Sequence, residues 1–526
     1  MNVGPQPFAL HPSPSYARVF VLLVLCLVCT IGHSIVPFTP PSLPLHSPFT
    51  PPSVESDLQS PPRLVVSIVV DQLRSDCLNA YSKNFTDGGF NRLMGQGTVY
   101  GSVSYPFTPV DRASATAAIA TGVSPYYNGI VGQRWLNRET LRPVWCVADE
   151  CHAGLQTTST MSAETLCTST LGDELKVATS GNAKVWAVAM SSDAAILSAG
   201  HAADGALWPN EEEKSTQRGW CSTQYYMKEL PQWVRTVGSP VKAKPNKGEQ
   251  QTGSNMNTAI TDMALRCVTS EAMGMDEVTD LLCLTYSAEC DEEGVEKSEE
   301  KYQQQNLYVR LDAEMTRLME TIERRVGREH VLFMVTGTGY NEDREVADYE
   351  KYRIPTGTFY MSRTADLLNM YLGAIWGAGK YVETTFRNHI FMDHALLDKK
   401  KISISNATNR AQELLVMMSG VRNVYTSLQL LTINNEQIQR VRHGYNPERC
   451  GDLVIETAPG WRVLTENTGE SEYLRSAFLQ FPVIFYGAGI EAQRSPESIT
   501  TDRIAPTLAR LMNIRAPNAC TAEPLF

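Results

Sequence analysis

The stretch from Leu64 to Gly122 most constrains how this chain can fold. It begins with the largely apolar run Leu64–Val70, which is typical of a buried parallel strand and ends at Asp71. A turn-rich segment later leads into an alanine-rich helix, expected from about Ala113 to Ala120. Ligands of open α/β sheets lie at the carboxyl ends of strands and at the N-termini of helices. We therefore expect Asp71 and Arg112 to face one pocket.

Segments along most of the chain carry a resemblance to one family. They are Arg112–Gly122 (RASATAAIATG), Asn128–Gln133 followed by Trp135, Leu171–Leu175, Ile196–Trp208, Tyr225–Trp233, Phe481–Ile490 and Thr501–Met512. In these segments the chain resembles the alkaline phosphatase superfamily, most closely its type I phosphodiesterase/nucleotide pyrophosphatase branch and the bacterial phosphate-irrepressible alkaline phosphatases. The resemblance implies an α/β fold, a three-layer sandwich with a largely parallel sheet and helices on both faces. It also implies cap insertions at about 200–260 and 365–450.

The N-terminal part of the chain has the pattern of a targeting segment. Arg18 precedes thirteen uncharged, mostly apolar residues, Val19–Ile31, and a small-x-small pattern ends at Ser34. This run is shorter than the roughly 20 residues that a membrane span needs. Residues 1–34 are therefore predicted to be a signal peptide, and the chain to be exported to the periplasm or cell envelope. An uncleaved N-terminal anchor remains the alternative.

Two further segments complete the predicted organisation. Residues 35–62 are rich in proline and read as an extended linker. Residues 63–526 are long enough for one large α/β domain with insertions, which the resemblance identifies as the alkaline phosphatase-like domain. We expect no membrane span in it after signal cleavage.

Charge and cysteine content narrow the class of partner and the compartment. The formal net charge of −11 argues against nucleic acid or an anionic membrane as the main partner. Of twelve cysteines, Cys26 and Cys29 fall in the predicted signal peptide, which leaves ten in an exported chain. Disulfides are plausible there, but buried free thiols fit as well, and spacing alone does not assign pairs.

The resemblance implies a catalytic centre with two zinc ions about 4 Å apart. In the family, three Asp and three His hold the metals beside an oxygen nucleophile. Here the nucleophile position holds Arg112, and a guanidinium is permanently protonated and can neither attack phosphorus nor bind zinc. Asp71 is retained at the position of the first zinc ligand, although capping of the following turn explains it equally well.

The other positions that the family uses depart from its pattern. They are Thr116, Gln133, Ser191, Asp193, Cys290, Gly294, Thr338 and Gly339. The resemblance implies a histidine that is not a metal ligand at Thr116, a phosphate-binding asparagine at Gln133, and a Lys-x-Arg pair at Ser191 and Asp193. It implies one Asp and one His ligand at Cys290 and Gly294, and again at Thr338 and Gly339. A shift by one residue would offer Asp291 in place of Cys290, but no histidine.

The third histidine ligand is expected within Asn467–Arg475, which contains no histidine. The loss of the nucleophile and of all three histidine ligands, while the sequence segments of the scaffold are retained, indicates a catalytically degenerate member. We predict an exported pseudoenzyme without a cofactor that binds a protein partner or a small phosphate-like ligand in the cell envelope. One alternative is an active metal-dependent phosphatase or phosphodiesterase with relocated ligands, drawing on Asp71, Asp111 and Asp291. A second is a phosphate or nucleotide receptor that uses Arg112.

Overall fold

The computed structural model describes residues 60–210, 219–238, 253–289, 297–339, 353–465, 469–472 and 480–526. The chain divides into two compact units, residues 1–58 and 59–526, and all described residues belong to the second. The predicted signal peptide and nearly all of the predicted linker lie outside the described residues, as do Cys290, Asp291 and Gly294. None of the helices within the described ranges is long and apolar enough to cross a membrane.

A ten-stranded sheet organises most of the described chain. Its strands are β1 (Leu64–Asp71), β2 (Thr98–Ser104), β5 (Gly154–Leu155), β6 (Val185–Val188), β7 (Gly205–Pro209), β8 (Trp220–Thr223), β9 (Asp280–Ser287), β10 (Val331–Gly337), β18 (Phe481–Gly487) and β19 (Gln493–Thr500). They lie in the order β19-β2-β18-β10-β1-β9-β6-β7-β8-β5. The middle of the sheet, from β10 to β7, is parallel. The flanking β18 and β8 pair with it in the antiparallel sense.

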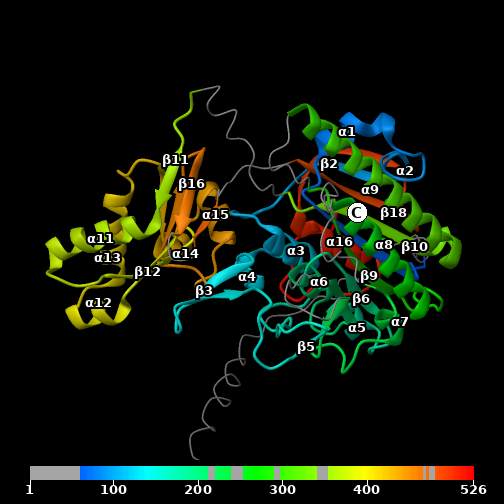
Figure 1. Cartoon of the computed structure of the whole chain (residues 1–526), viewed down its shortest axis with the longest axis horizontal. Coiled ribbons are helices and arrows are strands. Elements are labelled where there is room, and N and C mark those ends of the chain that lie inside the picture. Colours follow the sequence, from blue (N-terminus) through cyan, green and yellow to red (C-terminus); the bar gives the residue numbers. More distant parts are fainter. Residues whose placement is uncertain are drawn as a thin grey trace, which may run out of the picture. The chain divides into compact units, whose positions relative to one another are not determined.

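β1 lies in the parallel middle of this sheet. It pairs with β10 on one side and with β9 on the other, so that Leu64 is in register with both Val331 and Asp280. All eight of its residues are buried. The prediction of a buried parallel strand that ends at Asp71 is confirmed. Figure 1 shows its neighbours β9 and β10.

Helices cover both faces of the large sheet. Successive side chains of a strand point to opposite faces, so the apolar residues of a strand such as β1 need a covering layer on each side. Val65 and Val69 belong to a core shared with α3 (Arg112–Thr121), α5 (Leu171–Ala178), α6 (Ser192–Ala199) and α16 (Ile504–Leu511). Val66 and Ile68 belong to a second core, shared with α1 (Ser75–Tyr81), α2 (Phe90–Gln96), α7 (Gln232–Arg235), α8 (Gly253–Ser270) and α9 (Lys297–Val326). The predicted three-layer α/β sandwich is confirmed.

Residues between β10 and β18 form smaller sheets with their own core. One contains β12 (Val382–Phe386), β13 (His389–Met392), β14 (Val421–Thr426) and β15 (Leu453–Thr457), and the other β11 (Gly357–Tyr360), β16 (Trp461–Thr465) and β17 (Glu470–Glu472). The helices here are α11 (Met361–Trp376), α12 (His394–Lys400), α13 (Ile404–Leu415), α14 (Ser427–Thr432) and α15 (Glu436–His443). Leu368, Ala411 and Leu453 share this separate core.

The region expected to hold the first cap insertion, about 200–260, contains β7 and β8, which pair within the ten-stranded sheet. Residues 211–218 and 239–252 of this region lie outside the described part, so the boundaries of both cap insertions stay a prediction. A short helix, α4 (Pro125–Asn128), and a hairpin of β3 (Arg134–Asn137) and β4 (Arg142–Trp145) lie outside these groups.

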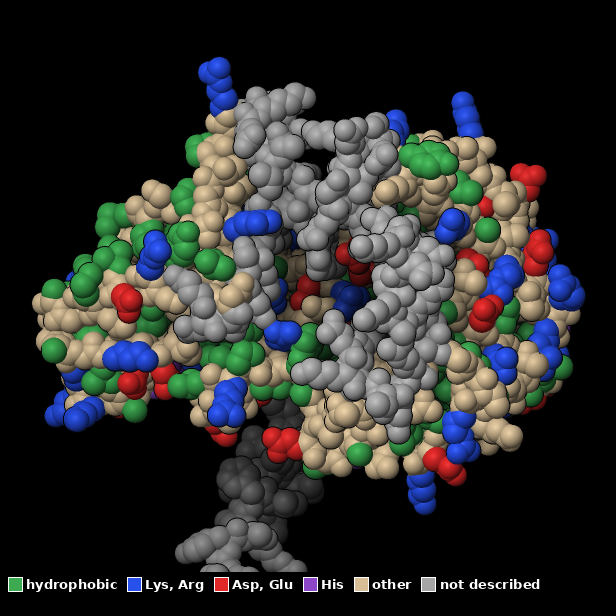
Figure 2. All heavy atoms as spheres, in the orientation of Figure 1, with side chains coloured by type: hydrophobic (Ala, Val, Ile, Leu, Met, Phe, Trp, Pro, Cys, Tyr) green, Lys and Arg blue, Asp and Glu red, His purple; other side chains and the backbone are tan. Residues whose placement is uncertain are grey.

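The face over α8 and α9 carries both signs of charge. Figure 2 shows Lys and Arg side chains interspersed with Asp and Glu side chains there. Arg317 of α9, for example, lies 2.6 Å from Asp262 of α8 and 2.7 Å from Glu314. Such a mixture is typical of a solvated helix layer.

The cysteines of the described ranges are free thiols, and most are buried: Cys77, Cys146, Cys221, Cys267, Cys283 and Cys450. Burial raises the pKa of the Cys283 thiol to about 12, which makes it unreactive at neutral pH. In this part of the chain these cysteines pack as small apolar side chains.

Candidate functional site

The candidate site lies where β1 ends and α3 begins. β1 delivers Asp71 at the carboxyl end of the parallel strands, in register with Ser287 of β9. Asp111 caps α3: its carboxylate accepts a hydrogen bond from the backbone N–H of Ser114, and the Ser114 hydroxyl accepts one from the backbone N–H of Asp111, both at 2.9 Å. This capping box fixes the first helical residue, Arg112.

The guanidinium of Arg112 lies between two carboxylates. Its Nη1 atom is 3.9 Å from Oδ2 of Asp71, and its Nε atom is 3.3 Å from Oδ2 of Asp193. The Nη2 atom also donates to both oxygens of Asp193 at 3.3 Å. Asp71 and Asp193 are each only 4% exposed, so Arg112 supplies positive charge to two buried anionic groups. Asp71 and Arg112 thus lie together, and Asp193 joins them as the third member of an ion triad. That they face one ligand pocket stays a prediction.

Of the two carboxyl groups in this triad, that of Asp71 is the less readily ionised. The hydroxyl of Thr338, just after β10, donates to its Oδ1 atom at 2.8 Å and accepts from the backbone N–H of Gln72 at 3.1 Å. Burial nevertheless raises the pKa of Asp71 to about 6, against the opposing effects of Arg112 and Thr338. The carboxyl group of Asp71 can therefore gain or lose a proton near pH 6.

Asp193 is held ionised by its neighbours. It lies in the first turn of α6, where the helix dipole favours negative charge, and Nε2 of Gln133 donates to its Oδ2 atom at 3.3 Å. Burial opposes the charge, but the Arg112 guanidinium and the surrounding hydrogen bonds hold the pKa of Asp193 below its usual range. The pKa values of the two carboxyl groups in the triad are thus shifted in opposite directions.

The remaining described positions singled out in the sequence follow or precede members of the site along the chain. Thr116 is buried on α3, one turn beyond Arg112, and Ser191 is the N-cap of α6. Gly339 has φ of +64°, and a Cβ there would lie 2.4 Å from the Phe481 ring. Glycine is required at this turn for both reasons.

Asp111, a candidate ligand in the relocated-metal alternative, has both carboxylate oxygens engaged. Oδ1 caps α3, while Oδ2 accepts a hydrogen bond from the backbone N–H of Gln133 at 2.8 Å. Oδ2 also lies 3.7 Å from Nη1 of Arg387, in the turn between β12 and β13. The geometry explains Asp111 as a structural cap. Arg387 carries no local signal in the sequence, because its contact depends on the distant folding of the β12–β13 hairpin.

The described residues do not fit the two zinc ions that the resemblance implies. Zinc sites use groups of His, Cys and carboxylate ligands, and within the described ranges no three such side chains are grouped to hold a metal ion. The oxygen and nitrogen donors around Arg112 include two carboxylates, the Gln133 amide and the Thr338 hydroxyl, and the Glu289 carboxylate also acts on Asp71. The guanidinium between the carboxylates would repel a metal ion.

The fold is alkaline phosphatase-like, whereas the site departs from the pattern that the resemblance implies. The model of the type I phosphodiesterase / nucleotide pyrophosphatase family matches residues 65–477, so the chain belongs to that family.

Relatives with this fold include named alkaline phosphatases. Alkaline phosphatase PafA of Elizabethkingia meningoseptica is 25% identical over 519 residues, covering 88% of this chain and 94% of that protein. Alkaline phosphatase PhoV of Synechococcus elongatus is 25% identical over 511 residues, covering 87% and 91%. The crystal structure of wild-type PafA matches with a TM-score of 0.75 at 24% identity, covering 88% of this chain and 98% of that one.

Proposed function

We propose that this family member has lost phosphohydrolase chemistry and acts by binding. The observation that carries the proposal is the Arg112 guanidinium, which stands at the start of α3 in ionic contact with Asp71 and Asp193. Hydrolysis of a phosphate ester needs an activated oxygen nucleophile and charge stabilisation for the transferring group. Arg112 cannot be deprotonated to act as a nucleophile, and its positive charge is already paired with two carboxylates.

The proposed setting is the periplasm or cell envelope, reached through the predicted signal peptide. The proposed ligand is a protein partner or a small phosphate-like molecule, bound at the former active-site pocket or at the cap region.

The receptor alternative, in which Arg112 itself holds phosphate or a nucleotide, has less support. A guanidinium recognises phosphate through its fork of N–H groups, and in this chain Nε and Nη2 both donate to Asp193. An anion would have to displace a buried carboxylate and would meet the negative charges of Asp71 and Asp193. Saturable binding of inorganic phosphate or AMP by calorimetry, lost in Arg112→Ala, would favour the receptor instead.

The names of PafA and PhoV favour one other candidate, an active metal-dependent phosphatase with relocated ligands. Its proposed ligands are Asp71, Asp111 and Asp291, although the Asp111 oxygens are engaged in the cap of α3. An oxygen-only ligand set would prefer Mg²⁺, Mn²⁺ or Ca²⁺ to Zn²⁺.

One experiment separates these functions. The full chain without its signal peptide is assayed on 4-nitrophenyl phosphate and bis(4-nitrophenyl) phosphate with Zn²⁺, Mg²⁺ or Ca²⁺ added, and its metal content is measured after desalting. We expect no turnover above that of the matched Asp71→Ala variant and no retained zinc. Turnover that EDTA and Asp71→Ala both abolish would overturn the proposal and establish the active enzyme.

A further inference from the structure

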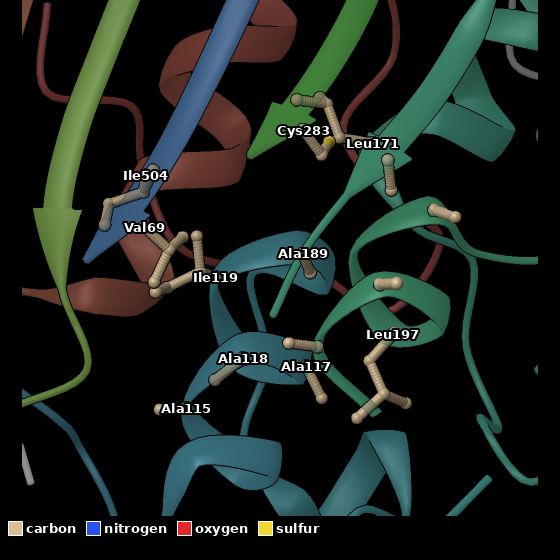
Figure 3. Packing of buried hydrophobic residues seen from close by; sticks show 14 of the residues in the cluster. Val69, Ala115, Ala117, Ala118, Ile119, Leu171, Ala189, Leu197, Cys283 and Ile504 are labelled. Atoms are coloured by element: carbon tan, nitrogen blue, oxygen red, sulfur yellow. The ribbon is translucent and has the colours of Figure 1, made fainter. Parts of the chain in front are cut away.

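A small cavity lies beneath α3, between that helix and the large sheet. Its volume is about 20 Å³, and its lining includes Ser67, Val69, Thr116, Ile119, Ser198 and Cys283. Figure 3 shows Val69 of β1, Ile119 of α3 and Cys283 of β9 in this layer. The cavity thus combines apolar walls with hydroxyl groups from three different elements.

The Thr116 hydroxyl in this lining is unsatisfied by the protein atoms that the structure describes. Thr116 is 1% exposed, and its Oγ1 atom has no hydrogen-bond partner among the described residues. A buried hydroxyl without a partner costs stability, and buried polar groups are normally paired with protein or ordered water. The location of Thr116 on the cavity lining indicates where such a partner can lie.

Two more hydroxyl groups open onto the same cavity. Ser67, Ser198 and Cys283 each retain 8% exposure, although the adjacent strand residues Val66 and Leu282 are fully buried. Since these positions lie in the protein interior, the retained surface faces the cavity that they line. The Ser198 hydroxyl donates to the carbonyl oxygen of Ala194 at 2.7 Å, which leaves its lone pairs to accept another hydrogen bond.

We infer that this cavity is a binding site for one ordered water molecule. A buried water molecule needs a cavity volume of about 10–15 Å³ and makes about three hydrogen bonds. This cavity is large enough, and three hydroxyl groups line it. The water accepts from the hydroxyls of Thr116 and Ser67 and donates to that of Ser198. It links α3 to β1 and α6 one turn below Arg112. This site is independent of whether the chain hydrolyses phosphate esters.

Two isosteric substitutions test the site. Thr116→Val removes the hydroxyl that contacts the water. Thr336→Val is the matched control. Thr336 is fully buried and its Oγ1 atom also has no hydrogen-bond partner in the described part of the chain, but it is not among the residues that line the cavity. We expect Thr116→Val to lower the melting temperature by a few degrees, because the buried water loses one of its hydrogen-bond partners. Thr336→Val should leave the melting temperature unchanged or raise it.

A high-resolution crystal structure of the wild-type chain gives a second readout that does not depend on any variant. We expect ordered solvent density within about 3.2 Å of Oγ1 of Thr116. A dry cavity would overturn the inference: it would show no density there, and Thr116→Val would be as stable as, or more stable than, the wild type. If Thr116→Val does not fold, the crystallographic density decides.

Discussion

The guanidinium of Arg112 and the carboxylate of Asp193 join the first turns of α3 and α6 through hydrogen bonds of 3.3 Å. A basic residue at a helix N-terminus faces the positive end of the helix dipole and is unfavourable there. Asp193 compensates for this, and Asp71 adds a second negative charge at 3.9 Å. Arg112 is therefore locally unfavourable at a helix start, and the tertiary structure compensates for it, which is typical of functional sites.

Replacing Arg112 by alanine should destabilise the fold. Asp71 and Asp193 would remain buried, each 4% exposed, and would lose the guanidinium between them. We expect the free energy of unfolding at pH 7 to fall by about 2–4 kcal/mol, near the low end for a broken buried ion pair, because the Arg112 side chain is itself 27% exposed. Urea unfolding followed by circular dichroism measures the change.

Two variants control this measurement. Adding Asp193→Asn to Arg112→Ala removes one of the stranded charges, so the double variant should lose less stability than the sum of the single variants. Arg410→Ala breaks an exposed pair with Glu413 on α13 and should have little effect. An Arg112→Ala variant as stable as the wild type would show that the triad makes no contribution to folding.

Asp71 should give the stability a pH dependence opposite to that of most paired carboxylates. Its pKa is about 6 in the folded chain against a usual value of 3.8, so the folded chain binds more protons than the unfolded chain between those values. Stability from this group is therefore greatest near pH 4 and is lost as the pH rises through 6. The loss is about 3 kcal/mol if the full shift is realised.

The Asp71→Asn variant isolates this effect, because it cannot titrate at that position. The difference in unfolding free energy between wild type and Asp71→Asn should change in favour of the variant from pH 4 to about 6.5, and then stay constant. Urea titrations at half-unit pH intervals measure it. A difference that is flat across this range would mean that Asp71 is ionised throughout.

The central strand and its carboxylate could be predicted from the sequence, because Leu64–Val70 is a largely apolar run and such a run is a local signal of burial. The meeting of Asp71 with Arg112 followed from a general rule about strand ends and helix starts. The ion pair of Asp193 with Arg112 could not be predicted, because 81 residues separate the two in the sequence and no periodicity connects them. The sequence likewise marked Thr338 only as a departure from the family pattern, whereas its hydroxyl donates to Asp71.

Arg449, which the sequence did not single out, should be important for stability. It lies between α15 and β15, and its guanidinium stacks on the Trp135 ring at 4.4 Å. It donates to the carbonyl oxygens of Gly129 at 2.5 Å and of Thr165 at 2.6 Å. Arg449→Lys keeps the charge but loses the planar fork, so we expect a loss of about 1–3 kcal/mol in unfolding free energy.

Arg442→Lys is the matched control for Arg449→Lys, because Arg442 also stacks on an aromatic ring, that of Tyr126, but at 5.4 Å. It should lose clearly less stability in the same urea experiment. Equal losses in the two variants would mean that the carbonyl contacts of Arg449 add nothing.

Restoring a hydroxyl at the start of α3 should not by itself restore hydrolysis. Arg112→Thr supplies an oxygen nucleophile at the position that the family uses, but a threonine hydroxyl needs a base or a metal to activate it. Thr338 and Gly339 would still stand where the resemblance implies an Asp and a His ligand. We expect no release of 4-nitrophenol from 4-nitrophenyl phosphate with added Zn²⁺ or Mg²⁺, in a variant that circular dichroism shows to be folded. Turnover that EDTA abolishes would mean that Arg112 alone suppresses a metal centre that is otherwise intact, and the proposed loss of chemistry would then reside in that single residue.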